Sequence, residues 1–432
     1  MSGTRVAALG AMASVWLVAA AAGLAENWPQ FRGPTGQGHS RESDLPVRWG
    51  GPERLNVLWE APLVGQGHAS PIVWGERVFV CTVHWPADVQ KSETVMPEHH
   101  VLCYDARDGK LVWDAKVPAG PWLRSDFRSG PGGGYAAPTP ATDGKRVYVA
   151  FGSAVLAALD FEGKLVWRRE LTPASFDVTV GSSPVLCGSN VILLCAMAQR
   201  KDSHLAAFEA AGGEVAWRTP MPETAFGHST PLLIRVNGKD QLIAVASGAA
   251  ASSHACQSFD PADGKRLWWC RGAGDVASAV FGGGLVYFDS GRGGKGVAVD
   301  AGGSGEVTAT HVRWNGPSLP QSLASPLIVG PHVYRLRGST SLECWKLADG
   351  SAVWSQKLEG LSSTWASPVA DAKGRIYVAT AGKSYVLQAG AEPRVLAVND
   401  LGDGNHPSPA VSNGRIFLVG AKSVWCVGNS TP

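Results

Sequence analysis

The sequence repeats one pattern about every forty to fifty residues along nearly its whole length. Each copy opens with Ser-Pro or Thr-Pro, continues through a Gly-containing turn and a β-branched run, and ends in a hairpin containing Asp, Gly and Trp in that order. The openings are Ser70-Pro71, Thr139-Pro140, Ser183-Pro184, Thr230-Pro231, a degenerate Ser278-Ala279, Ser325-Pro326, Ser367-Pro368 and Ser408-Pro409. The pattern therefore predicts roughly eight copies of one small structural unit.

Each copy has the features of four β-strands. The clearest is the second strand, a β-branched and aromatic run between turns, such as Val147 to Val149. The third and fourth strands form a hairpin, as from Tyr104 to Trp113, where Asp108-Gly109 supplies the turn. The Ser-Pro segment is the first strand, because proline cannot donate to a ladder and belongs at the start or the edge of a strand.

Separate four-stranded sheets would expose their edges, and radial closure protects them. The last copy ends after Val427 without a Trp-bearing fourth strand, whereas residues 56–63 resemble such a strand and precede the first copy. We therefore expect an all-β, eight-bladed β-propeller of four-stranded antiparallel blades over residues 56–428, closed by the N-terminal strand at 56–63. The recurring tryptophans are expected to pack between blades.

The two ends of the chain differ from the repeats. Arg5, an apolar run from Val6 to Ala22 and the small residues around Ala25 predict a signal peptide at residues 1–25, and hence a periplasmic or secreted protein. The alternative is a membrane anchor, but the run is at or below the length needed to span a bilayer. Residues 26–55 form a lead segment, and residues 429–432 a tail. No transmembrane segment is expected after signal cleavage.

The eight cysteines allow two interpretations in an exported protein. Several occupy equivalent strand positions in different repeats, which favours small buried residues over disulfides. Cys344 and Cys426 are expected to be unbridged because they fall in non-adjacent blades. Pairing within one repeat stays open for Cys81 with Cys103, Cys187 with Cys195, and Cys256 with Cys270.

Asp-x-x-x-Gly-x-x-x-Trp repeats with Ser-Pro starts resemble the pyrroloquinoline-quinone-like (PQQ-like) repeat. This repeat occurs in quinoprotein alcohol dehydrogenases and in the propeller of the outer-membrane protein assembly factor. The segment Asn27 to Pro34 resembles the opening of exported bacterial propellers of this kind. The resemblance covers nearly all of the mature chain and implies the fold; function has to be argued from the site.

The sequence lacks the features that the resemblance would imply for a quinone enzyme. It has neither adjacent cysteines nor a Cys-x-x-Cys-His segment, and no cluster of oxygen ligands for calcium stands out. No nucleophile elbow, zinc-binding helix or phosphate loop is present. No catalytic residue and no cofactor are therefore predicted. The sequence favours an exported, non-catalytic ligand- or protein-binding scaffold of the bacterial cell envelope, and the alternative is a PQQ-dependent or other oxidoreductase with calcium.

Topology predicts where a ligand site would lie. Loops that join the fourth strand to the next blade share a face with loops that join second to third strands. The residues three before each first-strand proline should line the channel mouth on this face: His68, Ala137, Gly181, His228, Val276, Leu323, Trp365 and His406. Of these, His68, His228, His406 and Trp365 are the candidate ligand-binding residues, with any metal unknown. The alternative is that the imidazoles only cap backbone groups.

The same face should carry a group of basic residues: Arg200, Lys201, Arg292, Lys295, Arg337 and Lys383. Such a face would attract an anionic or polysaccharide ligand or an acidic protein partner of the cell envelope. The alternative is scattered solvated charges without a common target. The net charge of +2 gives no reason to expect nucleic-acid binding.

Overall fold

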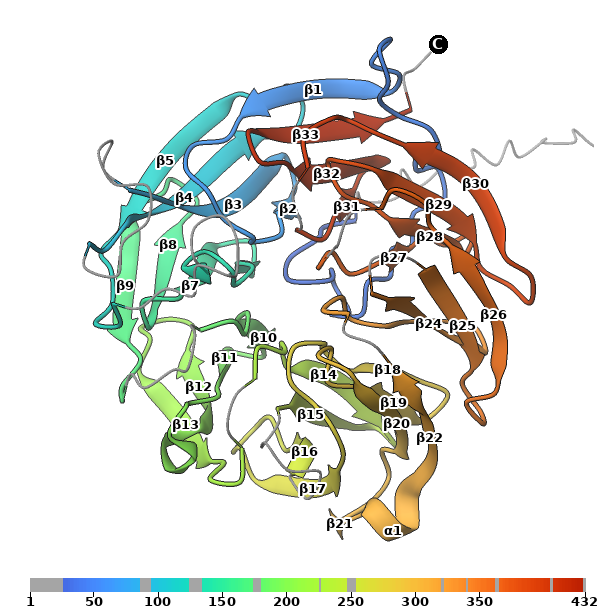
Figure 1. Cartoon of the computed structure of the whole chain (residues 1–432). Coiled ribbons are helices and arrows are strands. Elements are labelled where there is room, and N and C mark those ends of the chain that lie inside the picture. The colour runs from blue at the N-terminus through green and yellow to red at the C-terminus, as the bar shows by residue number, and fades with distance from the viewer. Residues whose placement is uncertain are drawn as a thin grey trace, which may run out of the picture.

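The computed structural model is an eight-bladed β-propeller, seen along its axis in Figure 1. It describes residues 26–85, 95–123, 134–173, 180–224, 227–246, 254–319, 322–338, 341–361, 365–404 and 407–429. Seven sheets have four strands and one has five. Within the described residues, no helix is long and apolar enough to cross a membrane. The predicted signal peptide lies outside the described residues and stays a prediction.

In blades 1 to 7 four antiparallel strands follow chain order from the channel outward. Blade 1 comprises β2 (Ile72–Trp74), β3 (Arg77–His84), β4 (Glu98–Asp105) and β5 (Leu111–Val117), and blade 2 comprises β6 (Ala141–Thr142), β7 (Arg146–Phe151), β8 (Val155–Asp160) and β9 (Leu165–Glu170). Blade 3 comprises β10 (Val185–Cys187), β11 (Asn190–Cys195), β12 (His204–Glu209) and β13 (Val215–Pro220). Blade 4 comprises β14 (Leu232–Val236), β15 (Lys239–Val245), β16 (His254–Phe259) and β17 (Arg266–Arg271). Blade 5 comprises β18 (Val280–Gly282), β19 (Leu285–Phe288), β20 (Gly294–Asp300) and β22 (Val312–Leu319). Blade 6 comprises β23 (Leu327–Val329), β24 (His332–Arg337), β25 (Ser341–Lys346) and β26 (Ala352–Lys357). Blade 7 comprises β27 (Val369–Ala370), β28 (Arg375–Val378), β29 (Ser384–Gln388) and β30 (Arg394–Asn399).

The predicted ring closure is confirmed in blade 8. Its inner strands are β31 (Ala410–Ser412), β32 (Arg415–Val419) and β33 (Ser423–Gly428), and its outer strand is β1 (Val57–Pro62) from the N-terminal side. Glu60 lies opposite Trp425 in the antiparallel register of β1 and β33. The first and last strands of the propeller are thus hydrogen-bonded neighbours (Figure 1).

The outer tryptophans join consecutive blades, as predicted. In each regular junction the indole N–H donates to a backbone carbonyl in the hairpin turn of the next blade, as Trp113 Nε1 does to Phe161 O at 2.9 Å. In every one of these junctions except that of Trp354, the turn glycine has a positive φ and packs under the indole: an added Cβ at Gly163 would lie 2.8 Å from Trp113. Equivalent bonds link Trp59 to Ala106, Trp167 to Ala210, Trp217 to Pro261, Trp314 to Leu347 and Trp354 to Gly390.

Two junctions depart from this arrangement. Between blades 4 and 5, Trp268 Nε1 donates to Gln241 Oε1 at 2.9 Å, and Gln241 Nε2 donates to Ala301 O at 3.2 Å, so that a glutamine relays the contact. Here β21 (Gly305–Glu306) also pairs in parallel with β17 as an unpredicted fifth strand, followed by the short helix α1 (Thr308–His311). Between blades 7 and 8, the outer strand β30 has no tryptophan. Trp49 of the lead segment stacks on Tyr377 of blade 7 instead.

The lead segment crosses one end of the channel, which the sequence did not predict. Trp28 pairs with Val73 of blade 1, and Pro29 O accepts a bond from Thr142 N of blade 2. Further along, Gln37 Oε1 accepts from Phe281 N of blade 5, and the backbone of residues 38–40 bonds to Ala370 of blade 7. Contacts to innermost strands on opposite sides of the ring place this segment across the axis, where Figure 1 shows it.

The eight cysteines are free, Cys344 and Cys426 among them. Of the three pairs left open by the sequence, the strand register places only Cys256 opposite Cys270, across β16 and β17. Cys81 instead lies opposite Val101, and Cys187 opposite Asn190. Seven of the eight thiols are buried, as expected for small core residues.

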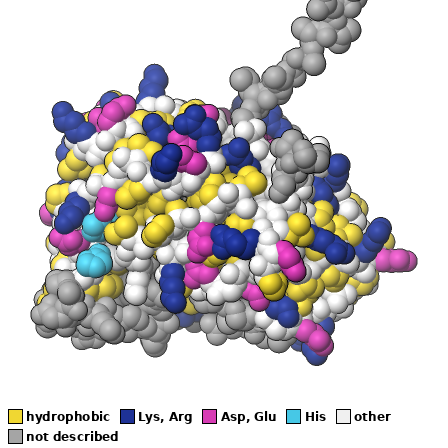
Figure 2. Space-filling model, turned by 90° about the horizontal axis from the view of Figure 1, so that it is seen from above, with side chains coloured by type: hydrophobic (Ala, Val, Ile, Leu, Met, Phe, Trp, Pro, Cys, Tyr) yellow, Lys and Arg dark blue, Asp and Glu magenta, His cyan; other side chains and the backbone are white. Residues whose placement is uncertain are grey.

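The rim of the propeller carries mixed charge. Figure 2 shows one side of it, where Lys and Arg side chains are interspersed with Asp and Glu and with apolar residues. The exposed apolar residues belong largely to outer strands, such as Leu58 of β1, Val166 of β9 and Val215 of β13. No single-sign charged patch is seen on the described part of this side.

Candidate functional site

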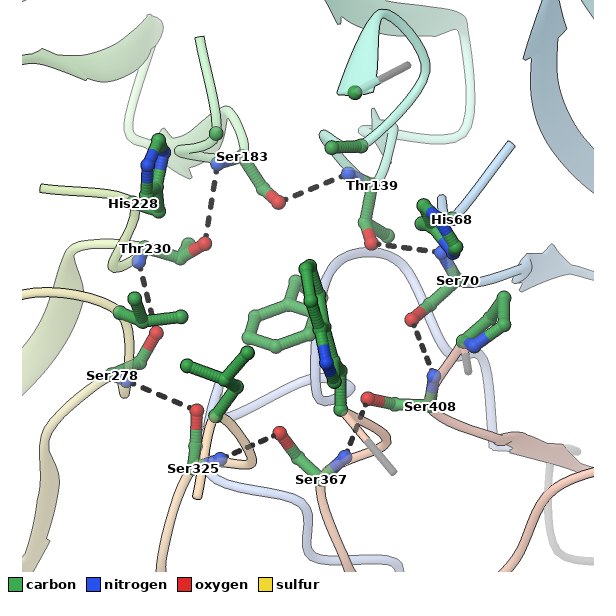
Figure 3. Close-up of a pocket in the computed structure, with 18 of the residues that line it drawn as sticks. His68, Ser70, Thr139, Ser183, His228, Thr230, Ser278, Ser325, Ser367 and Ser408 are labelled. Carbon is green, nitrogen blue, oxygen red and sulfur yellow. Dashed lines mark hydrogen bonds between the residues drawn. The ribbon is translucent and has the colours of Figure 1, made fainter. Parts of the chain in front are cut away.

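Eight hydroxyl side chains form a closed hydrogen-bonded ring around the channel (Figure 3). They belong to the Ser or Thr that precedes the first-strand proline, or Ala279 in blade 5. The backbone N–H of each residue donates to the hydroxyl oxygen of its counterpart in the next blade, from Ser70 N to Thr139 Oγ1 at 3.1 Å through to Ser408 N to Ser70 Oγ at 2.9 Å. The other members are Ser183, Thr230, Ser278, Ser325 and Ser367, with distances from 2.9 to 3.2 Å. The repeated Ser-Pro and Thr-Pro thus has a second role besides starting the strand.

A cavity of about 140 Å³ lies at this ring and opens at the channel mouth. All seven described residues of the predicted mouth positions line it: His68, Ala137, Gly181, His228, Val276, Leu323 and Trp365. Equivalent positions of a rotationally repeated fold end at the same height on the axis, so they meet around one opening. Whether this opening binds a ligand stays a prediction.

The candidate residues of the mouth pack against neighbouring blades. His68 stacks on Trp365, with ring centroids 5.8 Å apart and an interplanar angle of 27°. His228 lies over Gly181 of the preceding blade, where a Cβ would collide with the imidazole ring. Both histidines are only partly buried and border the cavity. The fourth candidate, His406, lies outside the described residues.

Of the predicted basic face, only Arg292 reaches the cavity. Its Nε lies 2.5 Å from Oδ2 of the buried Asp275, so much of its charge is compensated. Arg337 forms an ion pair with Glu343 at 3.0 Å. Arg200 and Lys201 lie in the 3-10 turn η3 (Arg200–Asp202), and Lys295 and Lys383 also fall outside the described cavity lining. Of these six residues only Arg292 therefore lines the described cavity, and a shared basic face stays a prediction.

The lead segment also borders the cavity, which the sequence pattern did not indicate. Phe31 of the lead segment lines the cavity, and Arg32 follows it. Arg32 is fully buried and donates from Nη2 to Pro326 O at 2.5 Å, one residue beyond Ser325 of the ring. Gly33, with φ of 78°, packs under the Trp28 indole and turns the chain. Because this segment occurs once, no repeat comparison could locate it.

The hydroxyl groups of the lining are held by backbone hydrogen bonds. A serine nucleophile needs a base within hydrogen-bond reach, but the ring hydroxyls accept bonds from backbone N–H groups, and no described hydrogen bond joins one to His68 or His228. Among the described residues, no group of three His, Cys, Asp or Glu side chains is placed to hold a metal ion. The arrangement supplies donors, two imidazoles and aromatic walls, which suit binding.

Comparison with known proteins identifies the family. The sequence family described as outer membrane protein assembly factor BamB matches residues 97–356 and 201–430. The chain belongs to this family. No curated protein matches it in sequence.

Solved structures share the fold at low sequence identity. BamB from Moraxella catarrhalis superposes with a TM-score of 0.53 at 15% identity, covering 80% of this chain and 95% of that chain. A europium-containing methanol dehydrogenase gives 0.67 at 12% identity, covering 92% and 89%. The quinohemoprotein alcohol dehydrogenase from Comamonas testosteroni gives 0.62 at 14% identity, covering 94% and 81%. Identities this low establish the propeller alone.

The cavity residues do not fit a quinone held with a calcium ion. Calcium prefers six to eight oxygen ligands that include carboxylates. The described lining contains no Asp or Glu, and its eight hydroxyl oxygens are already engaged by backbone N–H groups. Among the Lys, Arg, Asp and Glu side chains, the described lining contains Arg292 alone, which is a cation.

Proposed function

We propose that this protein is an exported, non-catalytic binding protein of the bacterial cell envelope, with its binding site in the channel-mouth cavity. The observation that carries the proposal is the convergence of His68, His228 and Trp365 on one cavity ringed by hydroxyl groups. Concave sites with aromatic walls and a few convergent polar groups are the usual setting for ligands. Membership of the family of an assembly factor supports a scaffold that also contacts a protein partner.

The binding role is tested with the mature chain and defined probes: inorganic phosphate, acetate, benzoate, glucose and N-acetylglucosamine. The double variant His68→Ala/His228→Ala removes both imidazoles from the cavity, and His311→Ala removes one from the rim helix α1. We expect equilibrium dialysis to detect at least one probe on the wild type, with affinity at least about tenfold weaker in the double variant and unchanged in the control. Melting temperatures should stay within a few degrees of each other.

Two outcomes would contradict the binding role of the cavity. In one, the wild type retains none of the probes; in the other, the double variant binds as tightly as the wild type. If the double variant instead melts far below the control, the imidazoles act as backbone caps, which is the alternative from the sequence.

The second candidate, a quinone-dependent oxidoreductase, rests on the fold shared with two dehydrogenases. It is tested by incubating the mature protein with pyrroloquinoline quinone and Ca²⁺ and following alcohol-dependent reduction of a dye. We expect no turnover above the protein-free control, because no described lining residue supplies a carboxylate ligand. Turnover that saturates with the quinone would establish the oxidoreductase.

A further inference from the structure

The ring hydroxyls present donors to the cavity. A hydroxyl group has one O–H donor and two acceptor lone pairs. In each of the eight side chains an oxygen lone pair receives the N–H of the preceding blade. Within the described residues, none of the eight O–H groups donates to a protein acceptor. An occupant of the cavity that accepts hydrogen bonds would satisfy them.

A buried positive charge lies just beyond this ring. The Arg32 side chain is fully buried, and its Nε and Nη1 have no hydrogen-bond partner. Its single bond goes to Pro326 O, and no carboxylate of the described residues forms an ion pair with it. Burial lowers the pKa of Arg32 to about 9, which leaves the guanidinium protonated at neutral pH. A buried charge is costly unless a counter-charge compensates it.

No negative side chain of the described lining offsets this charge. Arg292 is paired with Asp275 at the rim, and His68 and His228 can only add positive charge. A charge surrounded by low-dielectric walls acts more strongly on an occupant than it would in water. The cavity therefore presents hydroxyl donors, and the uncompensated charge of Arg32 lies behind its lining, next to Phe31 and against Pro326 O.

We propose that the cavity binds a small oxyanion, a carboxylate or a phosphate, and that Arg32 supplies the positive charge that selects it. The inference rests on the proposed binding function and names the ligand class. Phe31 and Trp365 provide apolar walls for the body of an organic anion. A cavity of about this volume accommodates a molecule the size of benzene, which sets the scale of the occupant.

The test compares benzoate with benzamide, a neutral molecule of nearly the same shape. Calorimetric titration of the mature protein at constant ionic strength should show benzoate binding at least about tenfold more tightly than benzamide, because charge-assisted hydrogen bonds are stronger than neutral ones. Inorganic phosphate is titrated in parallel. Tighter binding of phosphate than of benzoate identifies an inorganic anion, and the reverse identifies an organic carboxylate; either result supports an oxyanion site.

Variants in the lead segment test whether Arg32 supplies the positive charge. Arg32→Gln should weaken anion binding by about 10- to 100-fold, while Arg32→Lys should retain part of it. Arg41→Gln is the matched control: Arg41 lies in the same segment, but its side chain is 87% exposed and already has a counter-charge in the buried carboxylate of Glu26. Equal anion binding by the wild type and a folded Arg32→Gln would overturn the role of Arg32. If Arg32→Gln does not fold, the benzoate and benzamide titrations of the wild type still decide the ligand class.

Two outcomes separate this inference from the function on which it rests. Equal binding of benzamide and benzoate, or binding of glucose without any anion, would overturn the oxyanion site and leave the binding function standing. Absence of binding for every probe, neutral or anionic, would overturn both.

Discussion

Neighbouring blades are joined by different hydrogen bonds at the channel and at the rim. At the channel, all eight junctions use the same bond, from a backbone N–H to a hydroxyl of the next blade. At the rim, six junctions use an indole N–H and a turn carbonyl, and two use substitutes: Gln241 between blades 4 and 5, and Trp49 between blades 7 and 8. Neighbouring blades lie closest together near the axis, so the same short contact recurs there in all eight junctions. At the wider rim the gap between blades is larger, and different side chains fill it.

Opening the ring should cause the largest loss of stability. Deleting residues 26–63 removes β1, Trp49 and Trp59, and with them the outer support of two junctions. We expect the shortened chain to lose its cooperative melting transition, because the apolar face of blade 8 that packs on β1 becomes exposed. Calorimetry and small-angle scattering measure this. A truncated chain that melts like the intact one would show that the closure is dispensable.

The relay between blades 4 and 5 gives the next largest effect. Gln241→Leu leaves Trp268 Nε1, Ser258 Oγ and Ala301 O without their partner, and the free energy of unfolding should fall by about 2–4 kcal/mol. Gln356→Leu, on the outer strand β26, is the control and should change it by less than about 0.5 kcal/mol. Similar urea midpoints for both variants would mean that this junction does not depend on the relay.

One hydroxyl of the inner ring can be compared with one indole of the rim. Ser367→Ala leaves the buried Ser325 N–H unpaired and should lower the free energy of unfolding by about 1–2 kcal/mol. Trp354→Phe loses one bond to Gly390 O at a partly exposed position and should lower it by about 1 kcal/mol or less. Ser322→Ala, whose buried Oγ has no partner, serves as a near-neutral control. A larger loss for Trp354→Phe than for Ser367→Ala would reverse the ranking of the two ends.

Low pH should reduce the stability of the protein through His39 of the lead segment. Burial, and next the charge of Arg32, lower the pKa of His39 from 6.5 to about 4, despite its bond to the backbone of Ile328. The unfolded chain therefore binds more protons between pH 6.5 and 4, and stability is lost as the pH falls through this window. His39→Gln should reduce that loss by about 1–2 kcal/mol. Urea unfolding at pH 7 and pH 4.5 measures it, and parallel losses for both proteins would refute the assignment.

The smallest effect concerns the cysteines. Cys344 and Cys426 have no cysteine opposite them, so labelling of denatured, unreduced protein should always find these two thiols. Cys256 and Cys270, opposite each other in the irregular blade 4, are the pair that a mild oxidant could join. Mass spectrometry of the labelled protein distinguishes the two cases. A chain without any free thiol would contradict the prediction.

The fold could be predicted from the sequence because the signals are repeated eight times. Proline marks the start of every first strand except that of blade 5, and a glycine turn with a tryptophan marks most hairpins, so a copy that lacks one feature is still recognised from the others. The missing fourth strand after Val427 and the extra strand at residues 56–63 then predicted the closure that β1 and β33 form. β21 was not predicted because two residues pairing in parallel leave no sequence pattern.

The candidate site was predicted only in part, for the same reason. His68, His228 and Trp365 were found because their positions recur in every blade. Phe31 and Arg32 belong to a segment present once, whose contacts run mainly through backbone groups that any sequence possesses. The hydroxyl ring could have been anticipated from the Ser or Thr before each proline, since repeated polar side chains at the axis need partners.

The inner ring has a consequence for how such a molecule can be assembled. One residue per blade supplies both halves of the contact, its N–H to one neighbour and its hydroxyl oxygen to the other. In the language of oligomers, each blade is a subunit with a heterologous, head-to-tail interface. Such interfaces produce open filaments unless the rotation from one subunit to the next is a whole fraction of a full turn, in which case the ring closes. A blade with a different angular step would keep Ser408 N from reaching Ser70 Oγ, so the contact that closes the ring forms only when the eight steps add up to one full turn.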